Sequence, residues 1–440
     1  MKFNHANIKK LQKHAAKCII LRFQYKTNPM KNHIKAIIIA FLFVFMMFLQ
    51  ASAQKKPYHG IEFSCHDFVD TLKIKIWDGA IIIPVEINGE TKNMMFDTGA
   101  EMGFWIGEEE DWMTPSGNTI TFVDSQKTRQ KKAVMKLPPV KMGNITIENY
   151  TVVADNGLED YVCDKIDGAF GYDLVVRGLS FKFDTKDSLM IVTDRKGFFS
   201  KEEKGQPTLK YKRCHKTRPQ VWVDFPFHRI KLLFDSGAIG GDFDLPEYIM
   251  SIWAKDDPEL GRKMDEYTVL KDTTVYNSAG LFGRLNDTVP YRIYHCPEVE
   301  MGGITFTDVW VSTDNLTGKV GSAILKKNSL IIDGHKRRLV LLPHDGNMVQ
   351  YYGNEDKRGV KFLLADKNDT LGAIKVVVRK DGDAYRKGIR NDDYLIRIND
   401  VEITDYCTYL NLKEKIGANN DSPLRYIFRS PEGEIKEIDW

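Results

Sequence analysis

Two short segments of the chain each combine a carboxylate with a small hydroxyl residue and a glycine. MMFDTGAEMG spans residues 94–103, and LLFDSGAIGG spans residues 232–241. In both segments apolar residues lead directly into an aspartate, Asp97 or Asp235, so we expect a strand to deliver the carboxylate into a turn. The glycine that follows lets the backbone bend and pass close to a partner. We therefore predict that these two aspartates carry the chemistry of the protein.

Two carboxylates at short range would act as one acid–base unit. They cannot both ionise cheaply, so they share one proton and titrate as a pair. Such a pair can hold a water molecule, because one carboxylate takes the water's proton while the other donates to a peptide carbonyl. The expected reaction is amide hydrolysis without a metal, a cofactor or a covalent intermediate. The sequence has no HExxH zinc motif and no glycine-rich phosphate loop.

Both aspartate segments lie inside a wider internal duplication. PPVKMGNITIENYTVVADN (residues 138–156) and PEVEMGGITFTDVWVSTDN (residues 297–315) are identical at nine of nineteen positions. Further along, IDGAFGYDLV (residues 166–175) corresponds to TGKVGSAILK (residues 317–326). Three paired segments in the same order indicate two related lobes rather than a solenoid of many repeats.

The residues around each aspartate have the pattern of β-strands. IIIPVEING (residues 81–89) is rich in β-branched residues and ends in an Asn-Gly turn. Residues 221–235 have a similar strand-like pattern that leads into Asp235. Helical periodicity is best at Pro246–Lys255 and Leu260–Tyr267. We therefore predict a mainly β fold.

Both halves resemble aspartic proteases of the pepsin and retropepsin type, in which Asp-Thr-Gly or Asp-Ser-Gly carries the catalytic aspartate. The family's later apolar-apolar-Gly segment corresponds to Ala169-Phe170-Gly171 and to Lys319-Val320-Gly321, where Lys319 departs from the apolar preference. The resemblance covers residues 75–343, and the short lobes are most similar to fused retropepsin-like subunits. It implies a bilobal pair of β-barrels with Asp97 and Asp235 as catalytic residues.

The resemblance also implies supporting roles for neighbouring residues. Thr98 and Ser236 would lock the two aspartates through hydroxyl hydrogen bonds, and Gly99 and Gly237 would shape the loops.

Such a protease closes a hairpin over its substrate. The candidate flaps are Thr119–Val134 and Val275–Leu285. Trp105 and Trp112 are candidates for a substrate pocket, although tryptophans at such positions more often pack in the core.

The C-terminal segment resembles a PDZ domain, a small α+β fold. RGVKF (residues 358–362) is similar to the family's carboxylate-binding loop and strand, and residues 372–403 follow its strand, short helix and strand. Tyr406–Ile416 would be the groove helix. The resemblance implies that a peptide adds to the sheet edge as a strand, and the alternative is a spacer without a ligand. The peptide-binding residues would be Gly359, Val360, Lys361 and Phe362.

The net charge of +3 conceals an uneven distribution. Residues 1–35 hold nine of the 63 basic residues and no acidic one, and residues 36–53 hold no charge. The remainder has 54 basic and 60 acidic residues, a net charge of −6. This mildly acidic balance argues against a nucleic-acid partner.

The N-terminal segment is typical of a secretory signal peptide. The apolar run of residues 36–49 is too short for an ordinary transmembrane helix, and Ala51-Ser52-Ala53 is a small-residue cleavage pattern. A signal peptide from Met30 to Ala53 leaves residues 1–29 as a misannotated extension and predicts an exported protein. The alternative is an uncleaved membrane anchor. The five cysteines beyond it form no close pair, and their odd number leaves at least one without an intramolecular partner.

The predicted organisation has four parts after the signal peptide: two lobes, a linker and the PDZ domain. Their ranges are residues 54–205, 206–345, 346–358 and 359–440. The leading hypothesis is an exported aspartic endopeptidase whose PDZ domain docks a polypeptide substrate or a partner peptide. The alternative hypothesis is a catalytically inactive, protease-like scaffold that binds peptides.

Overall fold

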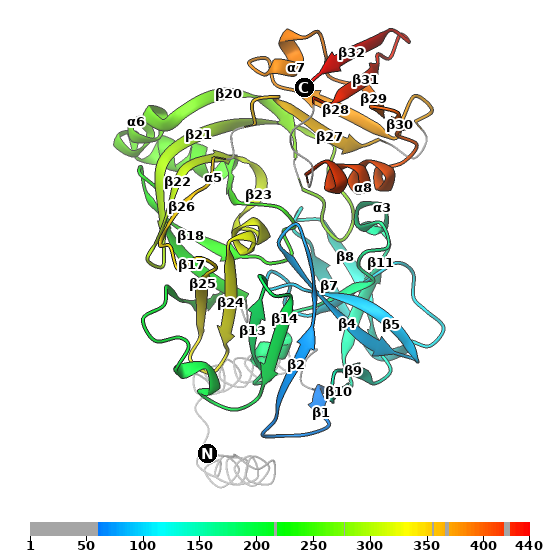
Figure 1. Ribbon diagram of the computed structural model, residues 1–440, viewed down its shortest axis with the longest axis vertical. Coiled ribbons are helices and arrows are strands. Elements are labelled where there is room, and N and C mark those ends of the chain that lie inside the picture. The colour runs from blue at the N-terminus through cyan, green and yellow to red at the C-terminus, as the bar shows by residue number, and fades with distance from the viewer. Residues whose placement is uncertain (1–59, 215–217, 277, 354–355, 366–368, 418–422) are drawn as a thin grey trace, which may run out of the picture. The chain divides into compact units, whose positions relative to one another are not determined.

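The prediction of a mainly β fold is confirmed: β-strands in four sheets are the predominant secondary structure of the described chain (Figure 1). The computed structural model describes residues 60–440, apart from 215–217, 277, 354–355, 366–368 and 418–422. These residues belong to one compact unit, Pro57–Trp440. The expected extension and signal peptide, residues 1–29 and 30–53, lie outside the described residues.

The first half of the chain forms an 11-stranded sheet in the order β1-β10-β9-β4-β5-β12-β6-β11-β8-β7, with β3 paired to β4. Its strands are β1 (Glu62–Phe63), β3 (Lys75–Trp77), β4 (Ala80–Ile87), β5 (Glu90–Phe96), β6 (Gly103–Ile106), β7 (Thr114–Val123), β8 (Arg129–Lys136), β9 (Val140–Met142), β10 (Ile145–Glu148), β11 (Thr151–Asp155) and β12 (Gly168–Phe170). The short helices α3 (Glu159–Val162) and α4 (Asp173–Val176) flank β12 in the sequence.

The second half forms a nine-stranded sheet in the order β19-β23-β18-β17-β21-β22-β26, with β16 paired to β17 and β20 paired to β21. Its strands are β16 (Lys212–Cys214), β17 (Arg218–Asp224), β18 (Arg229–Phe234), β19 (Phe243–Pro246), β20 (Thr268–Val275), β21 (Thr288–Met301), β22 (Ile304–Ser312), β23 (Asp314–Val320) and β26 (Val349–Tyr351). The expected linker, residues 346–358, therefore includes a strand of this sheet: β26 pairs with β22, and Gln350 is buried against Asn328.

The duplication is visible in strand order and in backbone conformation. The neighbours β4-β5-β12-β6 of the first sheet correspond to β17-β18-β23-β19 of the second. Gly143 and Gly302, which are equivalent in the repeat, both have positive φ angles, of 61° and 65°. Asn149 and Asp308 are also equivalent, and their φ angles are 58° and 59°. The two halves therefore share turns in the left-handed region as well as residues.

A third sheet joins the two halves. It has the order β15-β25-β24-β13-β14-β2, so that three strands come from each half of the chain. Its strands are β2 (Val69–Lys73), β13 (Ser180–Asp184), β14 (Leu189–Thr193), β15 (Thr208–Lys210), β24 (Asn328–Asp333) and β25 (Arg338–Pro343). β13 and β24 are antiparallel partners at the centre, where Phe181 and Ile332 lie side by side and are fully buried. The lobes are thus joined through a common core.

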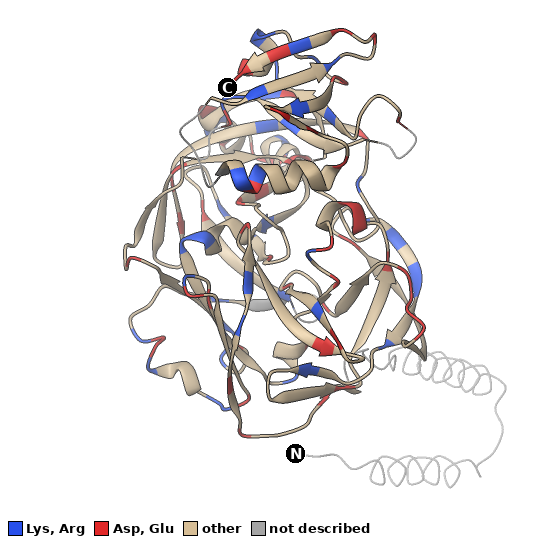
Figure 2. Cartoon of the chain, turned by 45° about the vertical axis from the view of Figure 1, so that its right-hand side comes forward, with Lys and Arg blue, Asp and Glu red and all other residues tan. Residues whose placement is uncertain are grey.

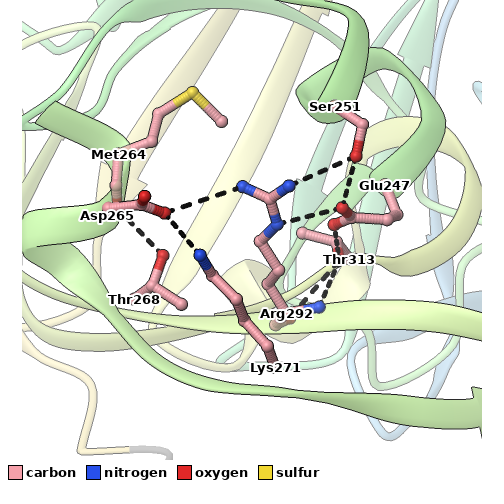
Figure 3. A network of polar contacts seen from close by, with 8 residues as sticks. All are labelled: Glu247, Ser251, Met264, Asp265, Thr268, Lys271, Arg292 and Thr313. Carbon is pink, nitrogen blue, oxygen red and sulfur yellow. Dashed lines mark hydrogen bonds and ion pairs between the residues drawn. The ribbon is translucent and has the colours of Figure 1, made fainter. Parts of the chain in front are cut away.

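Two helices pack on the second sheet, α5 (Glu247–Asp256) and α6 (Pro258–Tyr267). Their residue ranges are close to the two helices that the sequence predicted. A polar network holds them on the β20–β21 hairpin (Figure 3). Arg292 of β21 lies 2.9 Å from Glu247 of α5 and 4.0 Å from Asp265 of α6. Asp265 also pairs with Lys271 of β20 at 2.8 Å. Because Arg292 and Glu247 are largely buried, this network fixes both helices to the hairpin.

The C-terminal residues form a small α+β unit with its own core. Its sheet has the order β27-β28-β29-β31-β32, with β30 paired to β29. The elements are β27 (Val360–Leu364), β28 (Ile374–Val378), α7 (Asp383–Arg386), β29 (Tyr394–Ile398), β30 (Val401–Glu402), α8 (Tyr406–Gly417), β31 (Arg425–Arg429) and β32 (Ile435–Asp439). The expected groove helix, residues 406–416, coincides with α8 to within one residue.

Basic and acidic residues are interspersed over all the sheets (Figure 2). Among the described residues, none of the helices has the length and apolar character that crossing a membrane requires.

Candidate functional site

Each of the two aspartates follows the last residue of a central strand. Asp97 comes directly after β5, and its N–H donates to the Phe170 carbonyl at 2.9 Å. Asp235 comes directly after β18, and its N–H donates to the Val320 carbonyl at 2.8 Å. In each half the apolar-apolar-Gly segment runs parallel to the aspartate's strand, β12 beside β5 and β23 beside β18. The two backbones are therefore fixed in the same way.

The hydroxyl residues after the two aspartates connect the halves by four hydrogen bonds. The Thr98 N–H donates to Ser236 Oγ, and the Ser236 N–H donates to Thr98 Oγ1, both at 3.0 Å. The Thr98 hydroxyl donates to the Phe234 carbonyl, and the Ser236 hydroxyl to the Phe96 carbonyl, both at 2.6 Å. Both side chains are buried. The bonds are reciprocal, as expected for two loops related by an approximate two-fold axis.

The glycines of the two loops allow the carboxylates to approach each other. A Cβ atom on Gly99 would lie 2.3 Å from Asp235 Oδ1, and one on Gly237 would lie 2.4 Å from Asp97 Cγ. Either contact is far shorter than a van der Waals distance, so no other residue fits without moving the carboxylate. Each glycine is therefore required where the opposite aspartate passes.

The surroundings of Asp97 favour its protonated form. Burial raises the pKa of Asp97 to about 8, and the negative charge of Asp235 contributes next. Hydrogen bonds from the Gly99 and Ala100 N–H groups, at 2.7 and 3.1 Å, oppose this rise because they favour the charged form. At neutral pH the Asp97 carboxyl group is therefore mostly protonated.

Such a pair can hold and polarise one water molecule. The charged carboxylate accepts a proton from the water, and the protonated one donates to a developing oxyanion. Within the described part of the chain, no group of three or more His, Cys, Asp and Glu side chains is arranged to hold a metal ion.

The two candidate flap segments meet each other. The first is the β7–β8 hairpin, and the second is the loop between β20 and β21. At the tip of the hairpin, Asp124 accepts a hydrogen bond from the Phe282 N–H at 3.2 Å, and Gln126 donates to Ser278 at 2.8 Å. Ser125 is linked to β23, because the Thr317 hydroxyl donates to its carbonyl at 3.3 Å. The two segments are thus joined to each other and to β23.

Lys319, the departure from the apolar pattern, is buried and has an acidic neighbour. It lies opposite Asp244 in the β19–β23 pair, with 3.9 Å between Nζ and Oδ2. The equivalent pair in the first half is apolar, Ala169 opposite Phe104. Burial raises the pKa of Asp244 to about 7, although the Lys319 charge lowers it. The lysine is therefore the compensating charge for a buried carboxyl group that the first half lacks.

Sequence reasoning missed three residues that support the site. Arg218 donates from Nη1 to the Gly99 carbonyl at 3.0 Å and so holds the first aspartate loop. The Tyr150 hydroxyl accepts a hydrogen bond from the Gly171 N–H at 3.0 Å and lies 3.2 Å from Asp173. Both members of the Tyr150–Asp173 pair are fully buried. No local pattern distinguishes these residues, because each acts on a segment distant in sequence.

Trp105 and Trp112 belong to the core rather than to a substrate pocket. Trp105 is buried in the main apolar cluster, and Trp112 packs against it edge-on with 5.3 Å between ring centroids.

The four expected peptide-binding residues lie at the start of β27, but they differ in what they contact. Gly359 has a φ of 63° and passes close to Gly382, where a Cβ atom would lie 2.7 Å away. Val360 is buried in the core of the C-terminal unit, and Phe362 packs on Tyr409. The Lys361 side chain pairs with buried Asp314 of β23. Lys361 is thus a contact to the second half.

A disulfide and an ion pair attach the C-terminal unit to the first half as well. Cys163, which follows α3, is bonded to Cys407 of α8. Nearby, Lys165 pairs with Glu414 at 2.8 Å. The C-terminal unit is therefore bound to both halves, to the first through α8 and to the second through Lys361.

No protein-family model matches the sequence, and no curated protein matches it significantly.

Proposed function

We propose that this protein is an aspartic endopeptidase that hydrolyses peptide bonds with a water molecule activated by Asp97 and Asp235. The observation that carries the proposal is the reciprocal arrangement of the two aspartate loops. Each loop contributes a carboxylate, a glycine against the opposite carboxylate, and a hydroxyl that bonds the opposite backbone. If the two loops were only structural turns, they would not need reciprocal hydrogen bonds between residues 138 positions apart in the sequence.

The electrostatics support acid–base work by the pair. The pKa of Asp97 is raised to about 8, so this carboxyl group is an available acid at neutral pH, next to the carboxyl group of Asp235. The hairpin at β7–β8 and the loop before β21 supply a cover of the kind that excludes water during hydrolysis.

We further propose that the C-terminal unit is a peptide-docking domain of the PDZ type and that the protein is exported. Docking is supported by the edge strand β27 beside the helix α8. Export is supported by the Cys163–Cys407 disulfide, because such bonds persist in oxidising compartments.

The test is cleavage of a mixed peptide library by protein beginning at Gln54, from pH 4 to pH 8, with and without pepstatin. We expect cleavage that disappears in both Asp97→Asn and Asp235→Asn. A single variant that keeps full activity would exclude a shared mechanism. Peptide binding without cleavage at any pH would instead favour a non-catalytic scaffold that uses the same fold.

A further inference from the structure

The edge strand of the C-terminal unit has one row of backbone groups that faces away from its sheet. β27 is the last strand in the order and pairs only with β28 among the described strands. The Arg379 N–H donates to the Gly359 carbonyl, and the Ala365 N–H donates to the Ala373 carbonyl. Because pairing alternates along an antiparallel ladder, Phe362 and Leu364 direct their backbone groups outward. An edge of this kind accepts another strand.

Arg284 of the second half lies at this edge. It belongs to the loop between β20 and β21, and its Nη2 donates to the Leu364 carbonyl at 3.3 Å and to Asn286 at 3.2 Å. Burial raises the pKa of Tyr161 and of Tyr406, and the Arg284 charge partly offsets both rises. The guanidinium group contacts the end of β27, and its charge acts on both tyrosines.

The guanidinium group of Arg284 is incompletely satisfied. Its Nε and Nη1 atoms are buried and have no hydrogen-bond partner in the described part of the chain. The hydrogen bonds of Arg284 in the described part of the chain come from Nη2 and go to a carbonyl and an amide oxygen, not to a carboxylate. Buried charged donors without an acceptor are costly, and a carboxylate is the acceptor that best removes the cost.

We propose that the β27 edge and Arg284 form one docking site for an extended acidic peptide segment. The backbone of the segment pairs with the outward groups of β27, and an Asp or Glu side chain satisfies the free nitrogens of Arg284. Because Arg284 already donates to the Leu364 carbonyl, the segment pairs with the outward groups of Phe362. This inference rests on the peptide-docking role of the C-terminal unit proposed above. It adds that the docked peptide carries an acidic residue.

The proposed docking site is also linked to the β7–β8 hairpin, the candidate flap over the two aspartates. Phe282, two residues before Arg284, donates its N–H to Asp124 at the tip of the β7–β8 hairpin. A peptide held by Arg284 would therefore restrain the loop that the hairpin contacts. Binding at β27 is expected to slow hydrogen exchange at Phe282.

The experiment selects peptides on the immobilised full chain carrying Asp97→Asn, which removes cleavage from the readout. The probe is a pool of random octapeptides, followed by fluorescein-labelled members of the retained set. We expect enrichment of Asp or Glu at one position among the retained peptides. Adding Arg284→Gln should abolish that enrichment and weaken binding of a selected peptide roughly tenfold or more. Arg425→Gln is the matched control, because Arg425 is an exposed arginine on β31, paired with Glu437.

A second measurement does not depend on the folding of a variant. Replacing the acidic residue of the selected peptide by its amide should weaken binding to the Arg284 protein to the same extent. Retained peptides without acidic enrichment, equal binding of acid and amide, or no retained peptide would each overturn the inference. Because binding is measured without cleavage, failure of the protease proposal would leave this result unchanged.

Discussion

Thr98 and Ser236 each hold the backbone of the other's loop. Each side chain accepts a hydrogen bond from the other residue's N–H at 3.0 Å and donates one across the halves at 2.6 Å. Both residues are buried, so water cannot replace a lost partner. The relative position of Asp97 and Asp235 therefore depends on two hydroxyl groups that touch neither carboxylate in the described contacts.

Removing one hydroxyl should loosen both loops. Thr98→Ala leaves the Ser236 N–H and the Phe234 carbonyl buried without their partner, at a cost of ~1–3 kcal/mol for each group. We expect a lower thermal midpoint and loss of most peptide cleavage. Thr98→Ser keeps the hydroxyl and should retain both properties. If Thr98→Ala matched the parent protein in stability, the reciprocal bonds would not be what joins the halves.

The carboxylate pair predicts a pH dependence of stability. The folded pKa of Asp97, about 8, lies above its unfolded value of 3.8, so the folded state binds the extra proton between these pH values. Stability therefore falls as pH rises from about 4 to about 8, by at most ~1.4 kcal/mol per pH unit from this group.

Asp97→Asn should remove both turnover and this slope. Urea unfolding at pH 5, 6.5 and 8 would compare the variant with the parent protein, and peptide cleavage would be followed in parallel. We expect the variant to be inactive but to lose less stability between pH 5 and pH 8. An unchanged slope would mean that Asp97 does not carry the shared proton.

Lys319 should matter most at alkaline pH. Burial raises the pKa of Asp244 to about 7, so its contribution to stability already falls as pH rises from about 4 to about 7. Lys319→Ala removes the compensating charge and raises this pKa further, so the fall extends to higher pH. The thermal midpoint should therefore drop more at pH 8 than at pH 5, with a cost of at most ~3 kcal/mol. Adding Asp244→Asn should reverse the effect at pH 8, and a drop equal at both pH values would contradict the pairing.

The disulfide should be the strongest attachment of the C-terminal unit to the first half. It joins Cys163 and Cys407 across 244 residues. The double variant Cys163→Ser/Cys407→Ser should lose ~2–5 kcal/mol of stability. Mass spectrometry of a non-reduced digest should recover a peptide linked through these two cysteines. Cys296 is the control, because it is a free thiol that is buried. Burial raises its pKa to about 12, so this thiol should react slowly with iodoacetamide in the folded protein. Recovery of either cysteine as a free thiol would exclude the bond.

Sequence alone located the residues of the candidate site because their pattern is local. A strand followed by Asp-Thr-Gly-Ala or Asp-Ser-Gly-Ala needs only ten residues to be visible, and its repetition predicted two equivalent loops. The helix α5 was predicted for the same reason, since its periodicity lies within one segment, whereas α8 was expected from the resemblance to PDZ domains.

Tertiary structure decided which distant segments meet. Strands from both halves share one sheet, Lys361 pairs with Asp314, and Arg218 holds the Gly99 loop. None of these contacts follows from a local pattern, because each depends on how whole sheets pack. The amino-acid sequence determined the chemical groups and the strands that carry them. Only the packing of the two halves set the burial and spacing that raise the pKa of Asp97, since a carboxylate responds to its neighbours in space.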